Sequence, residues 1–217
     1  MKHLVLIADI VASRQLPDRK AVQQQLRQCL AELNQHHSGL VSPYTITLGD
    51  EFQAVFASAD GVFKDITHIM VALSPVRIRF ALAVGEITTA INPDQAIGMD
   101  GPAFYLARAG IEGLKKTDEL LAIGRDDGHP CELLSASLAL LNHHLTKWKT
   151  HRFETLLGLM SEQPVAEIAR RLDVSEQAVY KNIRTGGLEA VQAVFQALAE
   201  AINRDLAKGV LSEKGDG

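Results

Sequence analysis

Residues 3–8 form a run rich in Leu, Val and Ile that ends at Asp9. A short apolar run that stops at a charged residue is typical of a strand buried on both faces of a sheet. From Pro17 to about residue 36, apolar side chains recur at helical spacing, which predicts a helix. The chain therefore begins with a buried strand and a helix, and Asp9 lies at the end of the strand.

The segments that follow predict a β-hairpin and then further helices and strands. Two short segments rich in β-branched and aromatic residues flank the turn Gly49–Glu51. The predicted elements are strands over 44–48 and 52–56, a helix over 62–73, a strand over 76–87, a helix over 101–114 and a strand over 120–123. This order predicts an α+β fold of the ferredoxin-like βαββαβ type, with one helix and one strand appended. In that plan the first and third strands are neighbours, so Asp9 and Asp50 are expected to meet.

From about residue 130 the pattern becomes all-helical, and His129 and Pro130 predict the start of the first helix of this region. Trp148 is predicted to anchor this region on the preceding one. The predicted organisation is a palm-like α/β domain over 1–128, a helical domain over 129–207 and a flexible tail over 208–217.

Composition and charge limit the partners and the cellular location that we expect for the protein. The chain of 217 residues has net charge -4 and no long run of one sign, so its bulk charge indicates neither nucleic acid nor an anionic membrane as a partner. Asp9 interrupts the N-terminal run too early for a signal peptide, and no apolar stretch approaches the ~20 residues that span a bilayer. Cys29 and Cys131 lie far apart and outside any CxxC motif. We expect a cytoplasmic protein with no membrane partner.

Asp9 and Asp50 are candidate ligands of a divalent cation. Mg²⁺ and Mn²⁺ favour hard oxygen ligands and often hold a nucleoside triphosphate through only two protein carboxylates. Glu51, the next residue of the turn, is either a third ligand or an exposed turn residue. The alternative for the pair is local structure, with Asp9 as a strand-end or helix-capping residue and Gly49–Asp50 as ordinary turn chemistry.

The segment between the first strand and the first helix is a candidate phosphate-binding site. Backbone N–H groups from Ile10 onward, with the side chains of Ser13, Arg14 and Arg19, could cradle a triphosphate at the helix N-terminus. The alternative is that the two arginines are solvated loop charges.

Four segments along the chain each match a different motif of one enzyme class. They are Ala8–Val11, Leu48–Phe52, Arg79–Ile87 and Gly101–Ala109. In this order and at these spacings they resemble the motifs of class III adenylyl and guanylyl cyclases, and the hairpin also resembles the signature turn of GGDEF diguanylate cyclases. The resemblance implies a metal at Asp9 and Asp50, a transition-state role for Arg108 and a homodimer.

Two positions depart from the cyclase pattern. Phe104 stands where the resemblance places a transition-state asparagine, and the stretch Tyr44–Leu48 has no charged residue that could read a base. The loss of one transition-state donor and of the base reader would lower a cyclisation rate by orders of magnitude. The metal geometry could therefore persist while the reaction differs or is absent.

The segment Asp9–Arg14, with Arg19 close behind, is also similar to the start of the SatD family, a bacterial group. This resemblance covers most of the chain.

Residues 163–185 have the pattern of a helix-turn-helix. A short helix over 164–172 is followed by a turn that contains Val174, and Ser175 caps a second helix that continues through Arg184. The predicted packing positions are Ala169, Val174 and Val179.

The second helix of such a unit enters the major groove of DNA, where its early polar residues meet base edges. The outward residues predicted to contact DNA are Ser175, Gln177, Tyr180, Lys181 and Arg184. Residues 161–200 carry four basic and six acidic side chains, so a single copy should bind phosphates weakly and a dimer would do better. The alternative is that this unit packs against the palm or a partner protein.

These features support three hypotheses of function. The first is a bacterial regulator whose palm binds a nucleoside triphosphate with Mg²⁺ or Mn²⁺ and whose helix-turn-helix binds DNA. The second is an active nucleotidyl cyclase or transferase that uses the metal at Asp9 and Asp50 together with Arg108. The third is a catalytically dead palm that serves as a DNA- or protein-interaction module.

Overall fold

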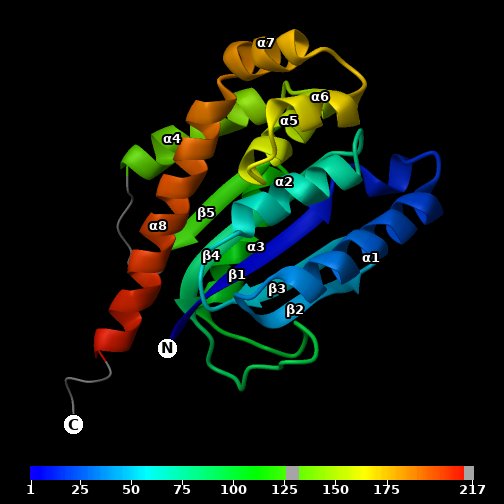
Figure 1. Ribbon diagram of the computed structural model, residues 1–217. Helices are drawn as coiled ribbons and strands as arrows, with labels where there is room; N and C mark the ends of the chain where they lie inside the picture. Colours follow the sequence, from blue (N-terminus) through cyan, green and yellow to red (C-terminus); the bar gives the residue numbers. More distant parts are fainter. Residues whose placement is uncertain (126–131, 213–217) are drawn as a thin grey trace.

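The computed structural model describes residues 1–125 and 132–212 (Figure 1). His129, Pro130 and Cys131 lie outside the described residues. Five strands form one sheet in the order β2-β3-β1-β4-β5. The strands are β1 (Lys2–Ile10), β2 (Leu40–Leu48), β3 (Glu51–Phe56), β4 (Ile78–Glu86) and β5 (Leu121–Arg125). The first and third strands are neighbours, as predicted from the order of elements, and the α+β class is confirmed.

The central strand β1 runs antiparallel to both β3 and β4, and the appended strand β5 runs parallel to β4. Helices α1 (Arg19–His36) and α2 (Val62–Ala72) cover one face of the sheet, and α3 (Pro102–Leu114) covers the other. Because successive side chains of a strand point to opposite faces, Leu6 and Ala8 join the core beneath α1 and α2, while Ile7 joins the core beneath α3. Asp9 continues the series on the α3 side.

The edge strand β2 begins earlier than its predicted start at residue 44. It pairs with β3 from Leu40 onward through several register shifts, and Pro43 lies within this irregular stretch. Proline cannot donate to a ladder, so it is tolerated on an edge strand or at a bulge. The sequence pattern showed only the regular half of the strand.

The remaining helices join the core on the α1 and α2 side of the sheet. They are α4 (Glu132–Leu145), α5 (Thr150–Met160), α6 (Val165–Leu172), α7 (Glu176–Gly186) and α8 (Leu188–Ser212). The rings of Phe63 in α2 and Phe195 in α8 stack with centroids 4.8 Å apart, and the Ala59 N–H donates to Asn203 Oδ1 at 2.7 Å. Trp148, the predicted anchor, is buried in the same core. One continuous apolar cluster thus joins the helical segment to the sheet.

Two details of the helical segment differ from the expectations. Val174 is 41% exposed, so its assignment as a packing position is wrong, whereas Ala169 and Val179 are buried as predicted. The physical reason is the left-handed conformation of Asp173 (φ 53°), which turns the chain so that the Val174 backbone bonds back to Ala169 while its side chain faces solvent. Helix α8 continues through Ser212, so the start of the predicted tail at residue 208 falls inside a helix.

Within residues 1–125 and 132–212, no helix combines the length and the apolar character that crossing a membrane requires.

A buried carboxyl group lies between α1, α2 and β2. The Tyr44 hydroxyl donates to Asp65 Oδ2 at 3.0 Å, and His37 Nε2 lies 3.6 Å from the same oxygen. The Gly39 N–H donates to His37 Nδ1, which places the proton of the neutral ring on Nε2, facing Asp65. Burial raises the pKa of Asp65 from 3.8 to about 7, although the Tyr44 hydrogen bond opposes the shift.

Replacing Asp65 with Asn tests the effect of this carboxyl group on stability. Because its pKa is higher in the folded protein than in the unfolded chain, the wild-type protein loses stability as pH rises from 3.8 to about 7. Asn stays neutral and can still accept from Tyr44. Asp65→Asn should therefore be close to wild type at about pH 4 and more stable above pH 7, by roughly 2–4 kcal/mol.

Urea unfolding across this pH range measures the difference, with the exposed Asp94→Asn as a control that should show no such trend. A stability difference that does not grow with pH would contradict the assignment.

Candidate functional site

Asp9 occupies the end of β1 on the α3 side of the sheet. Its side chain is buried, and Arg79 Nη1 of β4 and Lys115 Nζ at the end of α3 lie 3.5 Å and 3.9 Å from its two carboxylate oxygens. Asp9 Oδ1 nevertheless has no hydrogen-bond partner among the described residues. Burial raises the pKa of Asp9, the charges of Arg79 and Lys115 lower it, and the charge of Asp50 raises it further.

Asp50 reaches the same place from the β2–β3 turn. Gly49 has φ 61°, a left-handed conformation that suits glycine, and the Asp50 carbonyl accepts from the Ile10 N–H at 3.1 Å. The Ser13 hydroxyl donates to Asp50 Oδ2. The turn is thereby tied to the end of β1 by backbone and side chain, and the electrostatic effect of Asp50 on Asp9 reflects their proximity.

Glu51 and Arg108 form a second layer of charge beside the pair. Glu51 is the direct partner of Asp9 across the β1–β3 ladder, and its Oε1 lies 3.4 Å from Arg108 Nη1 of α3. The Arg108 side chain is 56% exposed, so this ion pair is weakly held. Phe104, one turn earlier on α3, is buried in the core beneath the helix. Of Phe104 and Arg108, therefore, only Arg108 presents a polar group to this region.

The donor set suits a hard divalent cation that also binds a ligand. A buried carboxylate oxygen without a hydrogen-bond partner, Asp9 Oδ1, lies near a second carboxylate, and such oxygens are the ligands that Mg²⁺ and Mn²⁺ prefer. Among the described residues, no group of three or more His, Cys, Asp or Glu side chains is arranged to hold a metal. A cation here would need oxygens from a bound phosphate or from water to complete its shell.

The turn after β1 presents unused backbone donors. Ala12 is left-handed (φ 53°, ψ 34°) and precedes the single 3-10 turn η1 (Ser13–Gln15). Among the turn, loop and cap hydrogen bonds of the described residues, none has the N–H of Ala12, Ser13 or Arg14 as its donor. Successive free N–H groups beside a left-handed residue form a concave anion-binding site.

The four residues predicted to bind phosphate lie in different environments in the structure. The Ser13 side chain is buried against Asp50, Arg14 is exposed, and Arg19 reaches over the turn, with its Nη2 3.1 Å from the point where a Cβ on Gly49 would lie. The Ile10 side chain points into the opposite core, and its N–H is already used by Asp50. Ser13 and Arg19 therefore lie at the β2–β3 turn, next to Asp50 and Gly49.

Arg79 and Lys115 are the site residues that sequence reasoning missed. Arg79 alternates with apolar neighbours in β4 and is the ladder partner of Asp9, a relation that follows only once the β1–β4 register is known. Lys115 lies seven residues after Arg108, which is two helical turns and hence the same helix face. That spacing was visible in the sequence, but it identifies Lys115 as a site residue only once α3 is known to cover β1.

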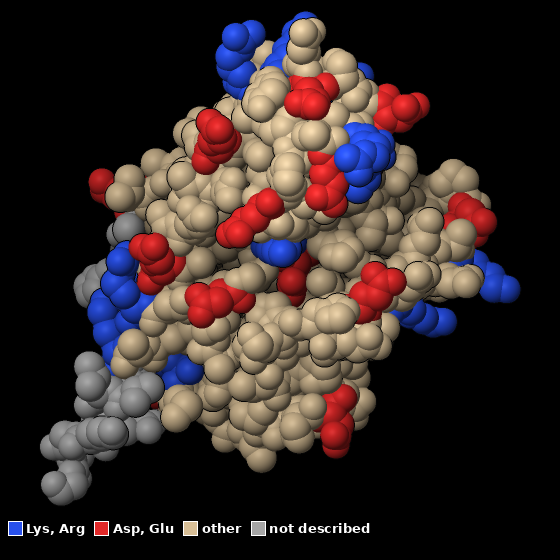
Figure 2. Space-filling model, in the orientation of Figure 1, with Lys and Arg blue, Asp and Glu red and all other residues tan. Residues whose placement is uncertain are grey.

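The residues predicted to contact DNA lie on one exposed face of α7. Ser175 caps this helix by accepting from the Ala178 N–H, as predicted. Gln177, Tyr180, Lys181 and Arg184 are all exposed, and Tyr180 is 59% exposed. Figure 2 shows basic and acidic side chains intermixed at the end of the molecule where α6 and α7 lie. The face has polar and basic groups without a continuous positive surface in that view.

The sequence was compared with known families and structures. A family model described as the SatD family matches residues 3–202. Among solved structures, a bacterial light-regulated adenylyl cyclase matches 57% of this chain and 42% of its own length, at 18% identity and a TM-score of 0.43. The guanylyl cyclase Cya2 matches 52% of this chain and 70% of its own, at 15% identity and a TM-score of 0.40. The chain thus spans less than half of the first structure, and no curated protein matches it.

Removing Arg79 tests the electrostatics of the site. Arg79→Gln leaves the buried Asp9 carboxylate with Lys115 as its remaining near cation. We expect a loss of about 2–4 kcal/mol in the free energy of unfolding at neutral pH, as for other broken buried ion pairs. The loss should shrink as pH falls through the raised pKa of Asp9, because the protonated group needs no cation.

The double variant Asp9→Asn/Arg79→Gln should recover most of the stability, and the exposed Arg27→Gln should change little. Chemical denaturation of the four proteins measures this, and an Arg79→Gln protein as stable as wild type at neutral pH would refute the proposed pairing.

Proposed function

This chain belongs to the SatD family, and we propose that its α/β part binds a nucleoside triphosphate together with Mg²⁺ or Mn²⁺ held by Asp9 and Asp50. The observation that carries the proposal is the buried Asp9 Oδ1, which has no hydrogen-bond partner in the described chain and lies beside a second carboxylate and a turn with unused N–H groups. A cation would satisfy the carboxylates, and a phosphate would satisfy the cation and the turn.

Each neighbouring residue has a role in this arrangement. Ala12, Ser13 and Arg14 offer backbone N–H groups to phosphate oxygens, and Arg14 and Arg19 offer guanidinium groups. Arg79 and Lys115 lower the pKa of the Asp9 carboxyl group against the effect of burial, and so favour its ionised form. The bound cation would neutralise phosphate charge.

Glu51 fits a supporting role better than a ligand role in this proposal. Its carboxylate lies within hydrogen-bond reach of Thr47 Oγ1 and pairs with Arg108. Arg108, being more than half exposed, could turn from Glu51 to a phosphate when the ligand binds.

The same geometry leaves room for an active nucleotidyl cyclase or transferase. Arg108 is the observation that favours this second function, since it pairs with Glu51, the ladder partner of Asp9. Phe104 weighs against cyclisation, because a buried aromatic ring supplies no donor where the cyclase resemblance implies an asparagine. We therefore favour a regulator that binds the nucleotide, with catalysis as the alternative and an inert interaction module as the third possibility.

We further propose that α6 and α7 form a helix-turn-helix that binds DNA. The support is the pair of short helices joined by the Asp173 turn, together with the exposed polar and basic face of α7. Because acidic residues outnumber basic ones over 161–200, phosphate attraction by one copy is small. A homodimer that presents two copies would double the contact, so we propose dimeric binding.

Nucleotide binding is tested by thermal unfolding of the full chain with ATP, GTP, CTP or UTP, each with Mg²⁺ or Mn²⁺. Ligand at about 100 times its dissociation constant stabilises the folded state by roughly 2.7 kcal/mol, which raises the melting temperature by several degrees. Asp50→Asn should abolish the metal-dependent part of this rise. Asp94→Asn, an exposed carboxylate outside the site, should retain it.

A screen without a metal-dependent shift for any of the four triphosphates would overturn the binding proposal. Chromatography of the same mixtures separates the alternatives: unchanged triphosphate supports a binding regulator, and a product that disappears with Arg108→Gln supports an enzyme.

DNA binding is tested by fluorescence anisotropy of a random-sequence DNA duplex at low salt. Lys181→Gln/Arg184→Gln should weaken binding and lower the slope of log affinity against log salt by about two, because two phosphate contacts are lost. Arg27→Gln on α1 should leave both quantities unchanged. Absence of binding by the wild-type protein, or an unaltered slope in the double variant, would contradict DNA recognition by α7.

A further inference from the structure

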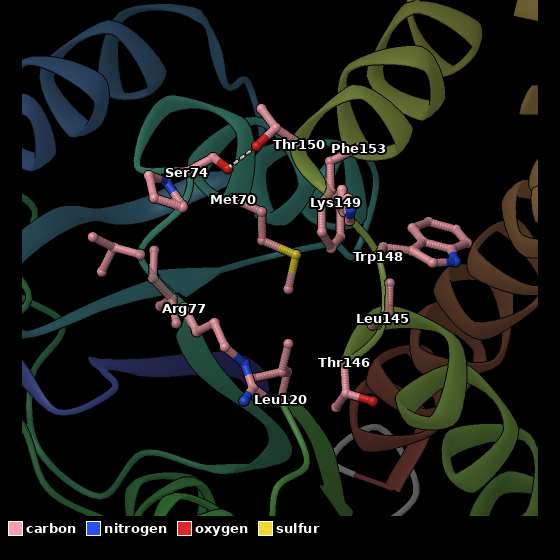
Figure 3. A pocket seen from close by; sticks show the side chains of 13 residues that line it. Met70, Ser74, Arg77, Leu120, Leu145, Thr146, Trp148, Lys149, Thr150 and Phe153 are labelled. Atoms are coloured by element: carbon pink, nitrogen blue, oxygen red, sulfur yellow. Dashed lines mark hydrogen bonds between the residues drawn. The ribbon is translucent and has the colours of Figure 1, made fainter.

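A cavity of about 370 Å³ lies between the α/β part and the helical segment, away from the carboxylate pair (Figure 3). One wall comes from the end of α2 and the start of β4, and the other from the connection between α4 and α5. The hydroxyls of Ser74 and Thr150 share a hydrogen bond that joins the two walls. Ligand sites occur preferentially at such junctions and at such volumes.

The floor of the cavity is apolar. Its buried side chains are Met70, Ile78, Leu120, Leu145, Trp148 and Phe153. The rings of Trp148 and Phe153 meet nearly edge to face with centroids 5.4 Å apart. Figure 3 shows Met70 projecting from the α2 side into the space between the two walls. A flat or chain-like apolar group would therefore be covered on several sides.

The rim is polar and carries positive charge. Its charged residues are Arg77 and Lys149, and none of the described acidic residues lines the cavity. Arg77 Nη1 donates to the Asp118 carboxylate at 2.9 Å and Nη2 donates to the Asp118 backbone carbonyl at 2.8 Å. The Asp118 side chain is 86% exposed, so its ion pair with Arg77 is weak. Lys149 is exposed and follows Trp148 directly.

Arg77 also has an unused buried donor. Its Nε is buried and has no hydrogen-bond partner among the described residues. Figure 3 shows the Arg77 side chain extending along the cavity wall to end beside Leu120. A buried donor without an acceptor is destabilising, and an anionic oxygen is the acceptor that a guanidinium binds most strongly.

We propose that this cavity is a binding site for a small amphipathic carboxylate. The apolar body lies against Met70, Trp148 and Phe153, and the carboxylate accepts from Arg77 at the rim, with Lys149 adding positive charge. A neutral apolar molecule would leave the positive charge of Arg77 and Lys149 without a partner, and a small hydrophilic anion would leave the apolar floor empty. The ligand class therefore follows from the two halves of the cavity together.

The site is independent of the nucleotide proposal, since Asp9, Asp50 and the turn after β1 do not line it. It is nevertheless connected to that turn, because the Arg77 carbonyl accepts from the Val11 N–H at 2.9 Å. A carboxylate in the cavity would also contact residues on both sides of the junction, and so would stabilise the packing of the α4–α5 connection on β4.

The chain offers a direct probe, because Trp148 is its only tryptophan. Phenylacetate and octanoate, titrated into the full chain, should change the tryptophan emission saturably. Phenylacetamide has the same ring without the charge and should bind about tenfold more weakly or worse, which is the contribution of a charge-assisted hydrogen bond. A response that is absent for both carboxylates, or equal for phenylacetate and phenylacetamide, would overturn the proposal.

Substitutions at the rim test whether Arg77 and Lys149 bind the carboxylate. Arg77→Gln, with folding verified by circular dichroism, should weaken phenylacetate at least tenfold and remove its advantage over the amide. Lys149→Gln should weaken it by a smaller factor, and the neighbouring Lys147→Gln, which does not line the cavity, should leave it unchanged. Undiminished phenylacetate affinity in Arg77→Gln would also overturn the proposal, and the wild-type comparison of acid with amide remains decisive if that variant does not fold.

Discussion

The antiparallel pairing of β1 with both β3 and β4 is the interaction on which the rest of the structure depends. It places Asp9 opposite Glu51 on one side and opposite Arg79 on the other. It also brings the β2–β3 turn to the end of β1, where the Asp50 carbonyl accepts from the Ile10 N–H. The carboxylates, their cationic partners and the N–H groups of the following turn converge because one central strand is hydrogen-bonded along both edges.

This convergence has an energetic consequence. Two nearby carboxylates, one of them buried, repel each other and lose hydration, and the raised pKa of Asp9 expresses that penalty. Arg79 and Lys115 offset part of it, but Asp9 Oδ1 remains without a hydrogen bond in the described chain. A site that is incompletely satisfied by its own protein is suited to bind a cation and an anionic ligand together. The buried Asp65 is a contrasting case, because burial raises the pKa of its carboxyl group to about 7 and Tyr44 donates to it.

The sequence was most informative about features that follow from periodicity and from the order of helices and strands. The order of strands and helices implied that the first and third strands are neighbours, and hence that Asp9 and Asp50 lie at the same end of the sheet. The roles of Arg79 and Lys115 could not be read in advance, since they depend on the β1–β4 register and on which face α3 covers. Val174 shows a similar limit, because the left-handed Asp173 decides its exposure. The cavity beside Trp148 arises from packing between segments distant in sequence, which no local pattern encodes.

The central claim is that Asp9 and Asp50 together hold a divalent cation that carries a triphosphate. Its most direct test is a crystal of the full chain grown with Mn²⁺ and a non-hydrolysable triphosphate, in which anomalous scattering locates the manganese. We expect a manganese peak at coordination distance from a carboxylate oxygen of both Asp9 and Asp50, with the phosphates against the N–H groups of Ala12, Ser13 and Arg14. A bound triphosphate whose manganese contacts neither aspartate, or manganese found only elsewhere on the protein, would contradict it.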